Sequence, residues 1–204
     1  MANDIFVPRD SADIARLIAE YPLAWIVSMG AEGSAATVLP LLAETDAAGE
    51  VVALFGHFGK SNPQVALLER QARALILFQG PHAYVPARLV SNPTWGPTWN
   101  YAVARFDVEI AFVPEETPAS VERLAAALEK DRPEPWTPAQ MDERREQLLR
   151  HIVAFRARVT GTHARFKLGQ DESAQTFDEI VAGLDDRALA DWMTHAVRGT
   201  ALGE

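Results

Sequence analysis

Apolar runs separated by short polar turns predict strands in the first half of the chain. Residues 23–29 are apolar and partly β-branched, and two glycines in the following turn, 30–33, favour positive φ. Further strands are predicted over about 34–43 and over 51–58, with a polar turn at 45–49 between them. These turns are too short for helical crossovers. The pattern therefore predicts an antiparallel meander.

Helix signals occur before, within and after this strand-rich region. Asp10 or Ser11 is suited to cap a helix that ends before Pro22, and Asn62 followed by Pro63 opens a second helix that reaches about residue 71. Both starts combine a capping side chain with apolar residues at helical spacing. Later helices are predicted over 121–130, 139–151, 174–184 and 186–197.

The remaining strands enclose a long segment of irregular composition. Residues 74–78 predict a buried strand, and residues 100–113 predict another with its apolar positions on one face. Between them, residues 80–97 hold four prolines and two glycines, which predicts a loop of the kind that is often functional. Residues 152–160 and 164–168 predict a hairpin that turns at Gly161.

Taken together, the elements predict an α+β protein. Its centre is a six- to eight-stranded antiparallel barrel-like sheet with peripheral helices. We expect one domain over residues 1–204, with a helical insert at about 115–151 and C-terminal helices at about 173–198.

Composition narrows the functional classes. The chain has 204 residues, 48% of them hydrophobic, which is enough for one buried core. It has no cysteine, so disulfides, thiolate zinc sites, iron–sulfur clusters and cysteine nucleophiles are excluded. No apolar run is long enough to cross a membrane, and residues 1–6 lack the basic and apolar regions of a signal peptide. We therefore expect a cytoplasmic protein with no membrane partner.

Common catalytic motifs are missing from the sequence. It has no G-x-G-x-x-G, Walker A, G-x-S-x-G or H-E-x-x-H pattern. The five histidines do not have metal-ligand spacing, so no metal site is expected; they are His57, His82, His151, His163 and His195.

Three segments concentrate polar and aromatic chemistry. Residues 56–63 place Lys60, Ser61 and the first amides of a helix together, which suits a phosphate, although an ordinary capped turn has the same residues. Residues 78–85 place His82 and Tyr84 at the end of a buried strand. There they could meet a flat heteroaromatic ligand at the mouth of a loop, or serve as a turn residue and a core residue.

The third segment is rich in tryptophan. Residues 92–101 carry Trp95, Trp99 and Tyr101, which are too large and apolar to stay singly exposed without a reason. They are expected to line a pocket, to enter a subunit interface, or to form a small satellite core under the loop.

These segments, in this order, resemble the PaiB-type FMN-binding negative transcriptional regulators, a branch of the flavin-reductase-like split β-barrel group. The resemblance covers about residues 5–185. It is carried by Leu-Pro-Leu-Leu at 39–42, Gly-His-Phe at 56–58, Asn-Pro-Gln at 62–64, residues 78–85, Pro-Thr-Trp-Asn-Tyr at 97–101 and Lys-Leu-Gly-Gln at 167–170.

The resemblance implies a homodimer of split barrels with FMN in each groove between subunits. It places one group of residues near the ribityl phosphate, a second near the flavin or its mouth, and a third in the same groove from the other subunit. Lys167 would supply a second cation. The group near the phosphate is His57, Lys60, Ser61 and Asn62. The group near the flavin is Gln79, His82 and Tyr84, and the group from the other subunit is Thr98, Trp99, Asn100 and Tyr101.

The chain departs from the family pattern at three places. Ala-Arg-Leu follows Pro86 where the family usually has Ser-Trp-Tyr, and Arg105 stands where a histidine is common. Asp171 and Glu172 replace an Asn-Arg pair, so a cation is lost and two carboxylates are gained. These departures predict weaker binding of an anion there, and with it weak or absent FMN.

Three functions follow as alternatives. The first is a flavin-binding cytoplasmic transcriptional regulator or accessory protein; the second is an FMN-dependent oxidoreductase of the flavin-reductase or pyridoxamine-phosphate-oxidase kind. A minor third is a haem-binding protein with His57, His82 or His163 as ligand. The net charge of −9 opposes DNA binding, but residues 143–167 carry a local excess of cations that could contact DNA, form ion pairs or face solvent.

Overall fold

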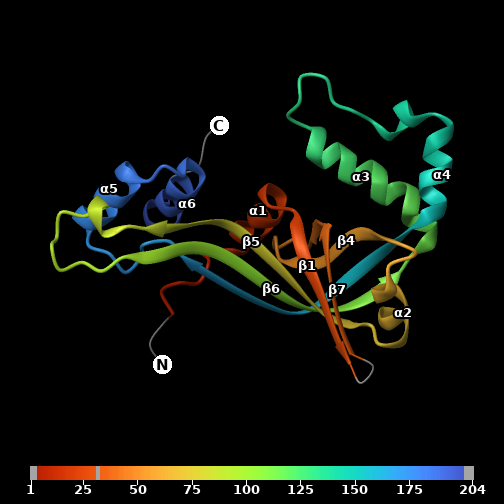
Figure 1. Cartoon of the computed structure of the whole chain (residues 1–204), viewed down its shortest axis with the longest axis horizontal. Coiled ribbons are helices and arrows are strands. Elements are labelled where there is room, and N and C mark those ends of the chain that lie inside the picture. The colour runs from red at the N-terminus through yellow and green to blue at the C-terminus, as the bar shows by residue number, and fades with distance from the viewer. Residues whose placement is uncertain (1–3, 31–32, 200–204) are drawn as a thin grey trace.

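The computed structural model describes residues 4–30 and 33–199 (Figure 1). Ala31 and Glu32 of the predicted turn, and the first three residues on which the signal-peptide prediction partly depends, lie outside this range. Gly33, at the end of the turn, has φ of +123°, the positive value predicted for a glycine there. No helix among the described residues is long and apolar enough to span a bilayer.

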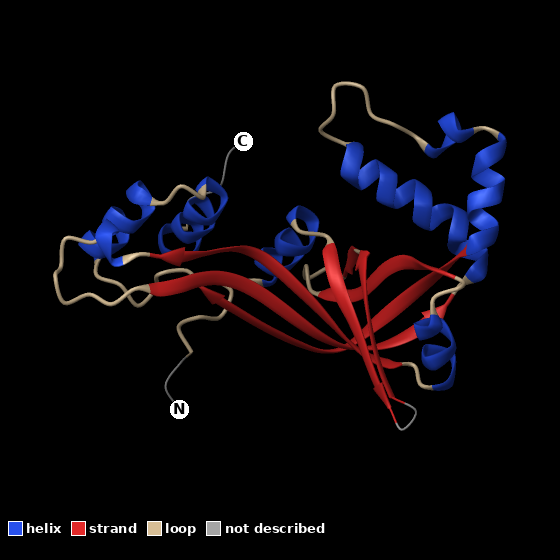
Figure 2. Cartoon of the chain, viewed as in Figure 1, coloured by secondary structure: helices blue, strands red, loops and turns tan. Residues whose placement is uncertain are grey.

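In the described part of the chain, one sheet of seven antiparallel strands forms the centre of the molecule (Figure 2). Its order is β2-β1-β5-β6-β7-β4-β3, and every neighbouring pair is antiparallel, as predicted. The strands are β1 (Leu23–Gly30), β2 (Gly33–Pro40), β3 (Leu42–Thr45), β4 (Val51–Gly59), β5 (Arg73–Val85), β6 (Thr98–Phe112) and β7 (Ile152–Lys167).

The two edges of the sheet are joined by a single sharp crossing. The predicted strand 34–43 is wrong as one element: it divides at Leu41 into β2 and β3, which lie at opposite edges. Leu41 is fully buried, and its N–H donates to the carbonyl of Pro22 at 2.9 Å. A Cβ at Gly56 of β4 would lie 2.5 Å from Leu41 Cδ2, so the crossing needs a glycine beneath it.

Two bulges make the central strands longer than predicted. β5 continues through Gly80 and Pro81 to Val85, because these two residues face one residue of β6 and Pro81 needs no ladder hydrogen bond there. The predicted loop 80–97 therefore starts later. The predicted hairpin at Gly161 is also wrong, since the glycine adjoins a bulge within one continuous strand, β7.

Among the described residues, six α-helices accompany the sheet, most of them as predicted. Side chains of Asp10, Asn62, Ser173 and Asp186 cap four of them. The predicted helix 139–151 is interrupted, because Asp142 has φ of +46° between a 3₁₀ turn and the helix proper. The helices are α1 (Ser11–Glu20), α2 (Pro63–Arg70), α3 (Thr117–Glu129), α4 (Glu143–His151), α5 (Ala174–Gly183) and α6 (Arg187–Arg198).

The helices leave one face of the long strands uncovered. α1, α5 and α6 lie on the same side of β5 and β6, while α3 and α4 form a separate insert at the other end (Figures 1 and 2). Trp192 of α6 is buried against Phe166 in an edge-to-face contact of 5.6 Å between ring centroids. Large apolar side chains on the opposite face stay exposed, among them Leu23, Trp25, Met29, Leu77, Tyr84 and Trp99.

An ion-pair network fixes the insert to the barrel. Glu44 of β3 accepts from Arg123 of α3 at 2.8 Å and from Arg156 of β7 at 3.1 Å. Both guanidiniums also lie over the ring of Phe55, 4.6 and 5.0 Å from its centroid. Burial alone would raise the pKa of Glu44, but the hydrogen bonds and charges of the two arginines outweigh burial and lower it.

Glu44→Gln is expected to lower the free energy of unfolding by about 1 kcal/mol near neutral pH, a figure that allows for solvent screening of a partly exposed group. A lowered carboxyl pKa stabilises the fold above the unfolded value and loses this effect as pH falls through the folded pKa. The gap between wild type and variant should therefore shrink between about pH 6 and pH 3. Urea titrations across this range measure it.

Glu115→Gln is the matched control, because Glu115 is exposed on the turn before α3. It should change stability by less than about 0.5 kcal/mol at every pH. A Glu44→Gln gap that is independent of pH would contradict the role given to the carboxylate.

Candidate functional site

Eight of the twelve predicted site residues form two clusters in the folded chain. The turn cluster, at the end of β4 and the start of α2, consists of His57, Lys60, Ser61 and Asn62. The aromatic cluster, at the far end of β5 and β6, consists of His82, Tyr84, Trp99 and Tyr101.

Asn62 builds the start of α2. Its Oδ1 accepts from the backbone N–H of Gln64 at 2.9 Å, and its Nδ2 donates to the hydroxyl of Thr37 at 3.0 Å. Pro63 follows at the first helical position, as predicted. The side chain of Asn62 therefore caps α2 and ties it to β2, while Ser61 beside it is exposed.

Lys60 connects the turn cluster to the helical insert. Its backbone N–H donates to the carbonyl of His151 at 2.8 Å, and its exposed Nζ donates to the carbonyl of Arg150 at 3.0 Å. Both carbonyls belong to the last turn of α4, where the helix dipole favours a cation. The ammonium group is solvent-accessible here and has only this one acceptor among the described residues.

His57 belongs to β4, and its side chain contacts the first turn of α3. Its Nδ1 is 3.2 Å from the hydroxyl of Ser120, and the Ser120 hydroxyl is also 2.8 Å from the carbonyl of Thr117. Burial lowers the pKa of His57. The imidazole is therefore a neutral group near pH 7 and not a cation that could pair with phosphate.

Gln64, which the sequence analysis did not assign to the site, anchors the turn cluster. It is fully buried, and its Nε2 lies 3.0 Å from the carbonyl of Ile26, 3.1 Å from the hydroxyl of Ser28 and 3.3 Å from the carbonyl of Ala35. Its Oε1 is buried without a partner in the described chain. A polar residue in the first turn of an amphipathic helix gives no sequence signal of burial, so periodicity could not have found it.

The aromatic cluster lies on paired strands and not at the mouth of a loop, which corrects the prediction for residues 78–85. His82 pairs with Tyr101, and Tyr84 pairs with Trp99, across β5 and β6. The Trp99 ring stacks on His82 at 6.4 Å and contacts Tyr84 at 6.0 Å between centroids. Trp99 and Tyr84 remain 54% and 49% exposed, so the cluster presents open ring surface.

Lys167 joins two other predicted residues beside this cluster. Its Nζ donates to the Thr98 hydroxyl at 2.9 Å and lies 3.5 Å from Asn100 Oδ1. Asn100 is buried, and its amide faces the sulfur of Met193 in α6 at 3.5 Å. These three side chains thus form one polar group at the end of the strands, with Asn100 serving the packing of α6.

The loop after β5 is held against α5. The backbone N–H and hydroxyl of Ser91 donate to Glu179 at 2.7 and 2.6 Å, and these bonds lower the pKa of Glu179. The indole N–H of Trp95 donates to Glu172 at 3.0 Å, and the ring packs against the core. Trp95 therefore packs on the main core and forms no separate core with the loop in the described chain, while Trp99 has open surface.

Within one chain the two clusters do not meet. Gly59, next to the turn cluster, pairs with Ile152 at the start of β7, whereas Tyr101 of the aromatic cluster pairs with Lys167 at its end. Fifteen residue steps of extended strand correspond to about 50 Å. Figure 1 shows the two regions at opposite ends of β6 and β7.

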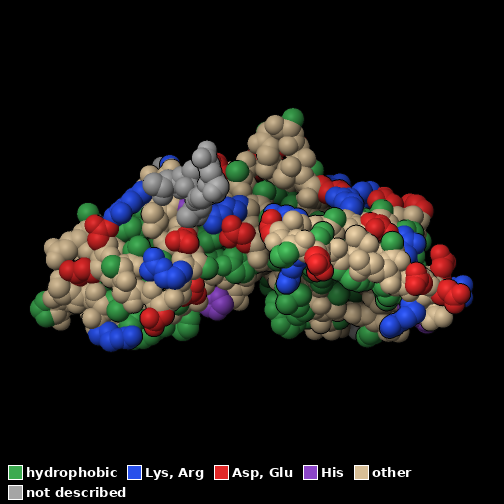
Figure 3. All heavy atoms as spheres, turned by 90° about the horizontal axis from the view of Figure 1, so that it is seen from above, with side chains coloured by type: hydrophobic (Ala, Val, Ile, Leu, Met, Phe, Trp, Pro, Cys, Tyr) green, Lys and Arg blue, Asp and Glu red, His purple; other side chains and the backbone are tan. Residues whose placement is uncertain are grey.

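A shallow groove of about 440 Å³ crosses the uncovered face between the clusters. Its floor is apolar and its rim is cationic. The molecule is indented along one side in Figure 3, with hydrophobic side chains on both flanks of the indentation. Residues that line the groove include Trp25, Leu77, Gln79, Val103, Arg105, His163 and Arg165.

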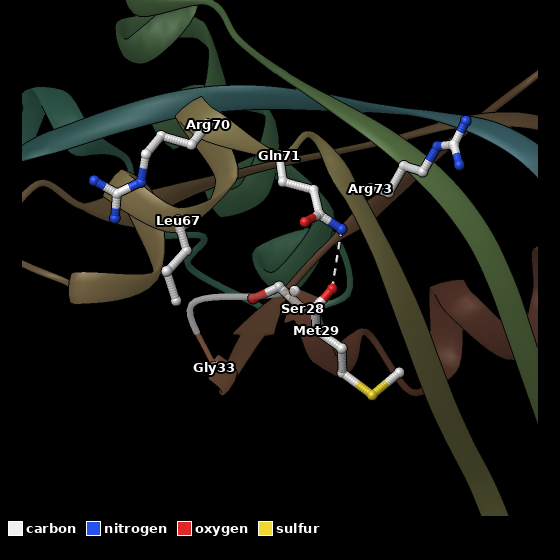
Figure 4. A pocket seen from close by; sticks show the side chains of 8 residues that line it. Ser28, Met29, Gly33, Leu67, Arg70, Gln71 and Arg73 are labelled. Atoms are coloured by element: carbon white, nitrogen blue, oxygen red, sulfur yellow. Dashed lines mark hydrogen bonds between the residues drawn. The ribbon is translucent and has the colours of Figure 1, made fainter.

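A second pocket lies where α2 meets the β1–β2 hairpin (Figure 4). Gln71 Nε2 donates to the Met29 carbonyl at 3.0 Å, and Gly30 leaves space for the Gln71 amide. Arg73 points away from the other labelled side chains in this view. The residues that line this pocket include none of the predicted site residues.

Comparison with known proteins decides the family. A family model described as “Putative FMN-binding domain” matches residues 2–161. A curated relative, the protease synthase and sporulation protein PAI 2 of Bacillus subtilis (strain 168), is 30% identical over 135 residues, which are 64% of each chain. This chain belongs to the PaiB-type FMN-binding family. The match leaves about a third of that relative's length uncovered.

Solved structures confirm the split-barrel fold of this family member. The FAD and heme binding protein of Mycobacterium smegmatis has a TM-score of 0.58 at 14% identity, covering 84% of this chain and 77% of that one. The flavocytochrome Anf3 of Azotobacter vinelandii has a TM-score of 0.54 at 10% identity, covering 78% and 67%. These identities are too low to carry function from either protein.

The sequence segments that this chain shares with the family have structural roles in the fold. Leu-Pro-Leu-Leu at 39–42 and Gly56 meet at the sheet crossing. In the late Lys-Leu-Gly-Gln segment, Gln170 donates to the Phe166 carbonyl and accepts from the Leu168 N–H, both at 2.7 Å, which closes the turn after β7. Glu172, one of the departures, is the residue that holds Trp95.

Gln64→Met should test the anchor of the turn cluster. Methionine keeps the length of the side chain but leaves the Ile26 and Ala35 carbonyls without their donor, so the free energy of unfolding should fall by about 2 kcal/mol. Urea unfolding followed by tryptophan fluorescence measures this change. Gln71→Met is the control, since Gln71 also donates to a β1 carbonyl but is exposed, and it should cost less than about 0.5 kcal/mol. Equal decreases in the free energy of unfolding for the two variants would show that the buried contacts of Gln64 stabilise the fold no more than the exposed contact of Gln71.

Proposed function

We propose that this family member is an FMN-binding homodimer and that each flavin site takes residues from both copies. One observation carries the proposal: the turn cluster and the aromatic cluster lie at opposite ends of an uncovered apolar sheet face. A single copy therefore cannot bring them to one ligand.

A two-fold dimer solves this problem by geometry. In such a dimer the two copies pack face to face, and the two-fold axis lies in the interface and crosses the strands at their middle. Each end of one copy then meets the opposite end of the other. The turn cluster of one protomer then faces the aromatic cluster of its partner. Trp25, 52% exposed, and Leu77, 37% exposed, would be buried near the centre.

The residues present fit the two ends of FMN. The Ser61 hydroxyl, the accessible Lys60 ammonium and the positive end of the α2 dipole suit a phosphate, and Lys167 supplies a cation near the other cluster. The open rings of Tyr84 and Trp99 suit a flat isoalloxazine. FMN supplies a redox-active ring when it is bound. The chain's own groups bind and orient it.

We further propose a regulatory or accessory role in the cytoplasm. The name of the curated Bacillus relative includes sporulation, and this supports regulation without specifying how it acts. Residues 143–167 carry seven Lys and Arg against two Glu. Four of these cations form ion pairs within the chain, with Glu122, Glu116, Glu109 and Asp4. Their charge is thus largely compensated, and DNA contact through this segment stays a prediction.

Trp25→Glu tests whether dimerisation builds the flavin site. Trp25 belongs to neither cluster, so the variant should lose FMN only if it also becomes a monomer. Light scattering after size exclusion gives the mass, and visible absorbance after incubation with FMN and desalting gives flavin retention. We expect a dimeric yellow wild type and a monomeric variant with at least tenfold less retained FMN.

Trp136→Glu is the matched control, because Trp136 is 41% exposed on the helical insert, away from the uncovered face. It should leave mass and retention unchanged. A monomeric wild type that keeps FMN, or a Trp25→Glu variant that becomes a monomer and still retains FMN, would overturn the shared site.

Lys60→Ala should weaken FMN about tenfold, or about 1.4 kcal/mol, and riboflavin less than twofold, because only FMN carries the phosphate. Fluorescence titration with each flavin measures both constants. Lys130→Ala controls for a lost surface charge, since Lys130 is exposed at the end of α3. Equal losses for the two flavins would place Lys60 away from the phosphate.

A further inference from the structure

The helical insert sets the chemical state of one residue of the turn cluster. Ser120, in the first turns of α3, is 1% exposed and lies against His57 of β4. Its Oγ is 2.8 Å from the Thr117 carbonyl and 3.2 Å from His57 Nδ1. Both distances are within hydrogen-bonding range, so the hydroxyl serves two partners.

Counting protons fixes the direction of the second bond. A carbonyl oxygen can only accept, so the single hydroxyl proton of Ser120 is used on Thr117. The hydroxyl oxygen must then accept from His57, and Nδ1 must carry the proton. In a neutral ring this leaves Nε2 with a bare lone pair.

The surroundings keep the ring neutral and Nε2 available. Burial lowers the pKa of His57, and within the described chain no carboxylate lies in ion-pair range of it. Nε2 has no hydrogen-bond partner among the described residues, yet it is not among the fully buried unpartnered atoms. It is therefore an acceptor without a partner in the described chain that is not fully enclosed.

We propose that His57 Nε2 accepts a hydrogen bond from a hydroxyl of the ribityl chain, and that Ser120 is the positioning residue that fixes the required tautomer. This inference rests on the proposed flavin site. It refines the sequence analysis, which placed His57 near the phosphate. A neutral acceptor has no proton to offer phosphate oxygens, whereas each ribityl hydroxyl can donate.

The separation of His57 and Lys60 along the chain agrees with one contacting the polyol and the other the phosphate. His57 and Lys60 are three residues apart at the end of β4, about 10 Å of extended chain, which is comparable to the length of a five-carbon polyol phosphate. Lys60 and the Ser61 hydroxyl would then hold the phosphate while His57 contacts the polyol. A metal role for Nε2 lacks support, since the described residues contain no group of three or more His, Asp or Glu that could hold an ion.

Nitrogen NMR of histidine-labelled protein tests the tautomer without any flavin. In wild type, the His57 Nδ1 signal should lie in the protonated range and Nε2 in the unprotonated range. Ser120→Ala removes the acceptor, so the Nε2–H form should become substantially populated and both shifts should move toward each other. The His57→Gln spectrum assigns the signals by their loss.

Thr117→Val is the matched control. It removes the hydroxyl that accepts from the Ala154 N–H and so loosens α3 on β7, but it keeps the Thr117 carbonyl and Ser120. Its His57 shifts should match wild type. A wild-type Nε2–H tautomer, or identical shifts in all three proteins, would overturn the role of Ser120.

A ligand series tests the polyol contact. FMN and riboflavin carry the ribityl chain, whereas lumiflavin has a methyl group instead. Ser120→Ala should weaken FMN and riboflavin by a similar factor of about three to ten and lumiflavin less than twofold, in contrast to Lys60→Ala, which separates FMN from riboflavin. Equal weakening of all three, or of none, would overturn the polyol contact. If wild type binds none of them, the proposed function fails, and the NMR shifts still decide the tautomer.

Discussion

The three central strands of the sheet are longer than the barrel that they help to form, and most of the molecule's organisation depends on this. A closed barrel would hide its strands, but β5, β6 and β7 continue past their neighbours as a ribbon of three strands. α1, α5 and α6 cover one side of that ribbon (Figure 2). The other side keeps large apolar side chains exposed, as an interaction surface does.

Buried and partly buried polar groups hold the parts that hydrophobic packing leaves undetermined. Gln64 connects α2 to both strands of the first hairpin, and Asn62 adds a bond to β2. Glu44 performs the same function for the insert, as does the Ser120–His57 pair. Because each of these contacts is directional, it fixes the position of an element where apolar contact would let it slide. The turn cluster is therefore positioned from two sides, by α2 and by the insert.

The local sequence pattern was sufficient to predict most helices and the antiparallel pairing of the strands. It was insufficient wherever a contact between distant residues decides where an element begins or ends. Caps at Asp10 and Asn62 act within a few residues, so they could be predicted. The division at Leu41 depends on Gly56, and the course of β5 through Pro81 depends on its pairing with β6. The same holds for the site. Residue types and the family resemblance suggested His57 and Lys60. Ser120, however, contacts His57 from α3, and the acceptors of Gln64 lie on β1 and β2, both distant in sequence.

Charge explains why self-association through the uncovered face is physically reasonable in an acidic protein. The chain carries −9 overall, so two copies repel weakly at long range, and salt screens this repulsion within about 10 Å. The face itself is different: Arg105 lies beside Asp107, His163 faces the same carboxylate, and Arg165 adds a further cation. A surface that bears both signs around an apolar floor can complement its own copy, which an isologous interface requires. In the proposed dimer, short-range burial of the indole and aliphatic side chains would then decide the association.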